Sequence, residues 1–172
     1  MLFTTHSIVG AAVGTATGNP VAGFLAGAVS HHVLDSILHF DQGSFRIQKS
    51  GAKYMGREAV LFSGYNEKFS KRDWVMLGVD FALAAILFVI IFSSLPESGW
   101  LLIMMGGLGG LAPDILDSSP LWSSKIREEI SLVRIYHKFH TYFHWTASRS
   151  EILWGSLTQV ILVIVAILYL LH

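Results

Sequence analysis

Histidines and aspartates recur in this sequence at spacings that suit a metal ion. His31, Asp35 and His39 are four residues apart, so they share one face if residues 20–39 form a helix. Neutral imidazole and carboxylate together favour Zn²⁺, Mn²⁺ or Fe²⁺. We therefore predict these three side chains as metal ligands. His32 lies about 100° around the same helix and is expected to position a ligand or to serve as an alternative one.

A second group of histidines follows an apolar stripe in residues 124–147. The stripe has spacings of 4, 3, 4, 3 and 4 and consists of Ile126, Ile130, Val133, His137, His140 and His144. This period predicts one amphipathic helix that buries its first half and directs its second half towards a polar site. We predict His140 as a ligand. His137 and His144 are alternative ligands or position the others.

Four further polar residues complete the candidate site. His6 precedes a glycine-rich stretch, and we predict it as a ligand. Pro113 is expected to end a helix, after which Asp114 is a predicted ligand and Asp117 a predicted general base. Asp80 lies within an apolar segment, where ionisable groups are costly and usually functional. It is expected either to orient a histidine ligand or to bond to a neighbouring helix.

Composition excludes several classes of protein. The chain has 172 residues, 52% hydrophobic and only 14% charged, which suits one domain and rules out disorder. Twelve basic residues balance twelve acidic ones, so there is no basic excess for nucleic acid. Cysteine is absent, which excludes thiolate metal sites and cysteine nucleophiles. No phosphate-loop or serine-elbow motif is present.

The positioning elements are predicted to be membrane helices. Residues 74–95, 100–117 and 152–171 are apolar enough to span a bilayer. Residues 7–39 are glycine-rich and broken at Gly18-Asn19-Pro20, which predicts a hairpin of helices at roughly 8–18 and 20–39. Glycines four apart allow close helix packing and also permit an oligomer. We expect an all-α polytopic membrane protein with one amphipathic interfacial helix.

Loop charge predicts which side of the membrane carries the candidate site. Lys and Arg concentrate in residues 42–73 and in the connection that holds residues 124–147. Positively charged loops stay in the cytoplasm. Every candidate residue except Asp80 then lies at or near the cytoplasmic surface of the membrane, although the residues come from four separate stretches of chain.

The motifs resemble those of a known family. A small multi-spanning chain with an early histidine, Pro113-Asp114-Ile115-Leu116-Asp117 and a later histidine cluster resembles the bacterial and archaeal membrane-bound, predicted metal-dependent hydrolases. That family has Pro-Asp-x-Asp-His, one residue shorter. Its later His-Arg-Gly-x-Thr-His corresponds only in part to His137-Lys138-Phe139-His140-Thr141.

A second resemblance is local. His31-x3-Asp35 followed by His39 is similar to a stretch of the zinc-dependent phospholipases C and related nucleases, which are soluble helical enzymes with several zinc ions. His140-x3-His144 stands where those enzymes have His-x3-Glu. Both resemblances imply metal-assisted hydrolysis.

These observations give one leading functional hypothesis and two alternatives. We expect a membrane-embedded hydrolase that holds one or two divalent ions, zinc before manganese or iron, and acts on a phosphoester or lipid-linked substrate at the cytoplasmic interface. The first alternative is a divalent-ion transporter or channel, in which Asp80 would lie on the ion path. The second is a non-catalytic membrane scaffold that binds a partner or anionic lipid through its basic loop.

Overall fold

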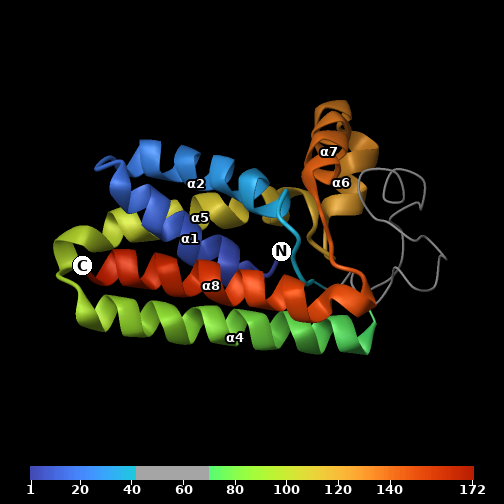
Figure 1. The fold of residues 1–172 in the computed structure, drawn as a ribbon. Coiled ribbons are helices and arrows are strands. Elements are labelled where there is room, and N and C mark those ends of the chain that lie inside the picture. Colours follow the sequence, from blue (N-terminus) through green and yellow to red (C-terminus); the bar gives the residue numbers. More distant parts are fainter. Residues whose placement is uncertain (42–69) are drawn as a thin grey trace.

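The computed structural model describes residues 1–41 and 70–172. Within these ranges all regular structure is helical, which confirms the predicted all-α fold. Short 3₁₀ turns at Glu97–Gly99 and Arg149–Glu151 precede two of the helices. The helices are α1 (Phe3–Ala16), α2 (Pro20–Asp35), α4 (Lys71–Ser94), α5 (Trp100–Asp117), α6 (Ser123–Glu129), α7 (Ser131–Phe143) and α8 (Ile152–Leu171) (Figure 1).

Three segments are long and apolar enough to cross a membrane. They comprise residues 71–94, 97–117 and 149–171, and their apolar 18-residue stretches have mean hydropathies of 2.7, 1.4 and 2.2. They overlap the predicted segments. Their outer surfaces remain apolar: Val75, Val79 and Ile161 are all exposed. Such surfaces are expected of helices that face lipid rather than water.

Glycines bring α1, α2 and α5 into backbone contact. A Cβ atom added at Gly10 would lie 2.6 Å from the carbonyl oxygen of Gly106, and one added at Gly27 or Gly110 would also overlap neighbouring backbone. Side chains larger than hydrogen would therefore force these helices apart. The close packing holds the carboxyl ends of α2 and α5 beside the start of α1.

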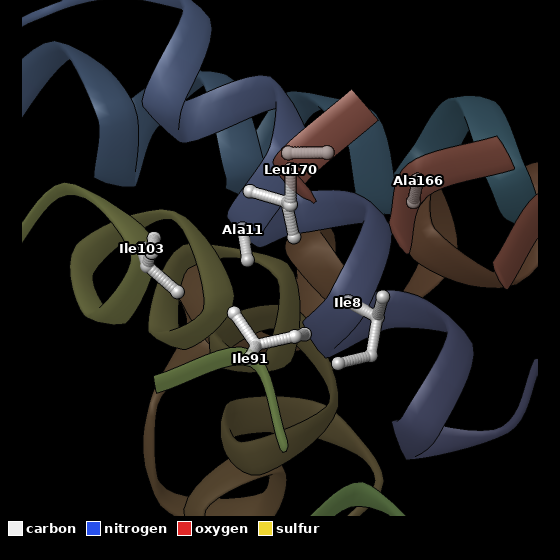
Figure 2. Packing of buried hydrophobic residues seen from close by; sticks show 7 residues of the cluster. Ile8, Ala11, Ile91, Ile103, Ala166 and Leu170 are labelled. Atoms are coloured by element: carbon white, nitrogen blue, oxygen red, sulfur yellow. The ribbon is translucent and has the colours of Figure 1, made fainter. Parts of the chain in front are cut away.

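A small apolar core surrounds α1 further along the bundle. Ile8 of α1 is fully buried together with Ile91 of α4 and Ile103 of α5, and Leu170 of α8 completes the group (Figure 2). Because this core joins the three candidate spans to α1, the N-terminal helix occupies the centre of the bundle rather than its periphery.

The chain directions bring the polar termini of five helices to one end of the bundle. α1, α4 and α8 begin at this end, α2 and α5 finish there, and α6 and α7 lie across it (Figure 1). The opposite end carries the α1–α2 turn, the α4–α5 connection and the C-terminus. This shared polar end is where the predicted site residues lie.

The N-terminal hairpin differs in its limits from the predicted 8–18 and 20–39. α1 begins at Phe3 because the carboxylate of Asp80 accepts the backbone N–H groups of Phe3 and Thr4, at 2.7 and 3.1 Å. α2 ends at Asp35, whose carbonyl accepts from the N–H of Trp145. His39 is therefore not on the helix, as predicted, but on an extended segment after it.

The predicted single helix over 124–147 is divided in two. Ile130 is extended between α6 and α7, and the guanidinium of Arg134 stabilises the break by donating to the carbonyls of Arg127 and Glu128. The apolar first half of the stripe is only partly buried, because Ile126 and Val133 are half-buried and Ile130 is 48% exposed. His144 follows the end of α7.

Two other predicted boundaries differ. α5 does not end at Pro113 but continues to Asp117, and the N–H of Ser118 closes the last turn on the carbonyl of Asp114. Of the predicted basic loop 42–73, residues 42–69 lie outside the described residues. Residues 71–73 form the first turn of α4, which Ser70 and Asp73 cap reciprocally.

Candidate metal centre

All six predicted ligands meet at the polar end of the bundle. α1, α5 and α7 each supply one ligand, α2 supplies two, and the segment after α2 supplies one. Each is buried, none with more than 6% of its surface exposed. Burial of this many ionisable groups requires that they be paired, hydrogen-bonded or bound to an ion. The six are His6, His31, Asp35, His39, Asp114 and His140.

Asp35 lies at the centre of the cluster, and imidazoles approach both of its oxygens. Its Oδ1 is 3.1 Å from Nε2 of His6 and 3.8 Å from Nε2 of His39. Its Oδ2 is 3.1 Å from Nε2 of His31 and 3.2 Å from Nε2 of His140. Four imidazoles thus present the same ring nitrogen to one fully buried carboxylate.

Asp114 lies on one side of Asp35. Its Oδ1 is 3.8 Å from Nε2 of both His31 and His140, and its Oδ2 is 3.9 Å from Nε2 of His6. Three donor atoms, one from each of His6, His31 and Asp114, lie within 4.8 Å of one another. These separations exceed a hydrogen bond and are compatible with an ion between the donors.

Asp41 lies on the other side, and the sequence prediction did not include it. Its Oδ2 is 3.3 Å from Nε2 of His39 and 3.5 Å from Nε2 of His144. It also accepts a hydrogen bond from the hydroxyl of Thr146, at 2.9 Å. The only signal in the sequence was that Asp41 follows His39 by two residues, which helical periodicity does not detect.

The outer ring nitrogens are held so that the inner ones face the cluster. Nδ1 of His31 donates to the carbonyl of Gly110 and Nδ1 of His39 to that of Ile37, both at 2.8 Å. A carbonyl can only accept, so each Nδ1 carries a hydrogen and each ring directs its Nε2 towards the cluster. Nε2 of His31 also lies 3.0 Å from Nε2 of His140. Metal-bound histidines are oriented in this way.

Several of these buried nitrogens are poorly satisfied. Nδ1 of His6 has no hydrogen-bond partner, and Nε2 of His6 and of His39 meet only carboxylate oxygens of the cluster, without hydrogen-bond geometry. A buried polar atom without a partner costs about 1–3 kcal/mol. Binding of an ion would satisfy the two Nε2 atoms, so the donor set fits a divalent cation.

Asp117, the predicted general base, faces α7. It bonds Nδ1 of His137 at 2.8 Å and Nδ1 of His140 at 3.0 Å, and Arg127 is 3.2 Å from its other oxygen. Burial disfavours the His140 imidazolium, but the hydrogen bonds to Asp117 and Asp35 outweigh it and raise the pKa of His140 to about 10. An ion at Nε2 would have to displace a proton.

The remaining predicted residues fall into different places. His32 packs beside the cluster, and its Nε2 lies 3.3 Å from the hydroxyl oxygen of Tyr136. Three donor atoms, one from each of His31, His32 and His140, lie within 4.8 Å of one another. His144 lies within the cluster, and burial lowers its pKa to about 3. Asp80 lies outside the cluster, where it caps α1; it bonds a neighbouring helix and not a histidine.

Two further contacts position the cluster and were not foreseen. The side chain of Gln159 in α8 accepts from the N–H of Leu2 and donates to the carbonyl of Phe40, at 2.9 and 2.8 Å. It thereby joins the start of α1 to the segment that carries His39. The Met1 amine lies 2.9 Å from Oδ1 of Asp35.

Comparison with protein-family models, curated proteins and solved structures found no match to this chain. The chemistry of the site therefore rests on its own geometry. Buried imidazoles and carboxylates converge on one volume with oriented donor atoms, which is an arrangement that can bind a divalent ion.

Proposed function

We propose that this chain is a membrane-embedded, metal-dependent hydrolase. The observation that carries the proposal is the inward orientation of imidazole Nε2 atoms around Asp35, with the Nδ1 atoms of His31 and His39 hydrogen-bonded outwards. Structural histidines in a core need no such common orientation, whereas metal ligands do. The resemblance of the sequence to membrane-bound hydrolases agrees with this proposal.

The donors favour a particular class of ion. Imidazole nitrogen mixed with carboxylate oxygen suits Zn²⁺, with Mn²⁺ and Fe²⁺ as the next choices. Such an ion lowers the pKa of bound water to about 7 and polarises a phosphoryl or carbonyl oxygen. His6, His31, His140 and Asp114 would hold it, with Asp35 beside them.

The surroundings of the cluster support a lipid or lipid-linked phosphoester as the substrate. α7 crosses the polar end of the bundle (Figure 1) and carries exposed apolar side chains, among them Leu132, Ile135 and Phe139. A helix of this kind lies in the interface, where phosphate head groups are found. From the loop charges we place this interface on the cytoplasmic side.

The alternatives receive less support from the geometry. A transporter would use Asp80 on an ion path, but both carboxylate oxygens of Asp80 accept hydrogen bonds from the start of α1. A scaffold would act through the basic loop, most of which lies outside the described residues. A buried cluster of oriented donors is also unnecessary for a scaffold.

A hydrolysis assay tests the proposal. The detergent-purified protein would be incubated with phospholipids and lipid phosphates after loading with Zn²⁺ or Mn²⁺. We expect hydrolysis that a chelator abolishes and that is lost in His31→Ala. The control variant His172→Ala should keep the activity, because His172 lies on the exposed C-terminus. Hydrolysis that survives both the chelator and His31→Ala would refute the metal-dependent mechanism.

A further inference from the structure

We infer that the cluster binds two ions, that Asp35 bridges them, and that Asp41, His39 and His144 hold the second one. This inference extends the proposed metal-dependent function and rests on it. It concerns how many ions are bound and which side chains hold each of them.

The number of donors exceeds what one ion uses. A tetrahedral Zn²⁺ takes four ligands and Mn²⁺ commonly six. Here eight side chains supply donors, and they divide into two sets with Asp35 between them. The first set is His6, His31, His140 and Asp114, and the second is His39, His144 and Asp41.

Asp35 is placed to serve both sets. Oδ1 is close to His6 of the first set and to His39 of the second. Oδ2 is close to His31 of the first set, at 3.1 Å, and to His144 of the second, at 3.8 Å. One carboxylate between two groups of imidazoles is the geometry of a bridging ligand.

The orientation of His39 points independently to a cation on the Asp41 side. Its Nδ1–H donates to the carbonyl of Ile37, so Nε2 is the ring nitrogen that faces the cluster. This buried Nε2 lies 3.3 Å from Oδ2 of Asp41 and 3.8 Å from Oδ1 of Asp35. Three donor atoms, one from each of Asp35, His39 and His144, lie within 4.8 Å of one another. Neighbouring carboxylates repel unless a positive charge lies between them. The Met1 amine, 2.9 Å from Oδ1 of Asp35 and 4.0 Å from Oδ2 of Asp41, supplies one such charge, and a bound ion would add to it.

Thr146 orients His144 in the same way. The Thr146 hydroxyl donates its hydrogen to Asp41, so it accepts from Nδ1–H of His144, at 2.9 Å. Nε2 of His144 is left as a lone pair near the carboxylates of Asp35 and Asp41. The two imidazoles of the second set therefore both direct Nε2 towards carboxylates.

The segment that carries the second set is well anchored. His39 donates its N–H to the carbonyl of Trp145 and accepts from the N–H of Ala147, at 3.2 and 2.7 Å. Gln159 holds the carbonyl of Phe40. Such a backbone fixes the ligands before an ion arrives, which favours binding.

Ion counting separates this inference from the proposed function. The whole chain, freed of metal and reloaded with Mn²⁺, should bind two ions per chain. Asp41→Asn and His39→Ala should each retain one, and His6→Ala should also retain one. One ion in the unaltered chain would overturn the second site and leave the proposed function standing, whereas no ion would overturn both.

Electron paramagnetic resonance tests the bridge. Two Mn²⁺ ions joined by a carboxylate are spin-coupled, so the fully loaded chain should show a coupled spectrum. Asp41→Asn should show isolated Mn²⁺ only. Two bound ions without coupling would overturn the role of Asp35.

A conservative variant guards against misfolding as the cause of a lost ion. Thr146→Val keeps the side-chain volume but removes the hydrogen bonds to His144 and Asp41. We expect it to weaken binding of the second ion by about 10–100-fold while the first ion and the helical circular dichroism stay unchanged. Equal weakening of both ions would contradict the division into two sets.

Discussion

Asp117 shows how one carboxylate can set the state of a neighbouring ligand. It bonds the outer nitrogens of His137 and His140 and faces Arg127, so its oxygens are already engaged. We therefore propose that Asp117 positions His140 rather than accepting a proton from water. The sequence identified the residue, but its role depended on the α7 contacts, which spacing alone does not provide.

Asp117→Asn distinguishes the two roles. The amide keeps the size and one acceptor but loses the charge that holds His140. We expect affinity for the first ion to fall by about 10–100-fold, as measured by titration with Zn²⁺. Unchanged affinity with a loss of turnover alone would instead favour a general base.

The raised pKa of His140 predicts proton release on metal binding. With a pKa of about 10, His140 is protonated near neutral pH when no ion is bound, and an ion must displace that proton. Affinity should therefore rise with pH from about 6 to 9. Calorimetry in buffers of different ionisation enthalpy measures the released proton, and a heat independent of the buffer would contradict this expectation.

At the scale of elements, glycine packing places the ligands. Gly110 of α5 contacts the backbone of His6, and its carbonyl accepts from Nδ1 of His31. A single glycine therefore positions ligands from two other helices.

Gly110→Ala tests this packing, with Gly78→Ala as the control. A methyl group at Gly110 would overlap the carbonyl of His6, whereas one at Gly78 meets no atom within 4 Å. Overpacking costs about 1–3 kcal/mol. We expect Gly110→Ala to lower both the melting temperature and the ion affinity, and Gly78→Ala to lower neither. Equal losses in the two variants would contradict the role of Gly110 in placing the ligands.

The elements also show the limits of prediction from sequence. Long apolar runs predicted three spans well, because length and hydropathy are local properties. The break at Ile130 and the early end of α2 depend on hydrogen bonds from Arg134 and Trp145, which are not encoded in local periodicity. His39 and His144 therefore reach the cluster from extended segments, and Asp41 joins them without any helical signal.

At the scale of the whole molecule, the polar groups collect at one end of an apolar bundle. The α4–α5 connection and the C-terminus lie at the other end (Figure 1). If the three candidate spans cross the bilayer, the two ends face opposite compartments. From the loop charges we expect the cluster on the cytoplasmic side.

Cysteine labelling tests this orientation cleanly because the native chain has no cysteine. Ser98→Cys, between α4 and α5, and Ser124→Cys, in α6, are both at exposed positions. In intact cells a membrane-impermeant maleimide should label the first, and should label the second only after permeabilisation. The reverse pattern would place the cluster outside.

The central claim, that buried histidines and aspartates hold a metal ion, is tested most directly by X-ray absorption spectroscopy. The protein would be purified in detergent and its metal edge recorded. We predict nitrogen and oxygen neighbours at about 2.0–2.2 Å with the scattering signature of imidazole, lost in a His31→Ala/Asp35→Ala variant. An ion shell without imidazole, or no ion after reloading, would contradict the account.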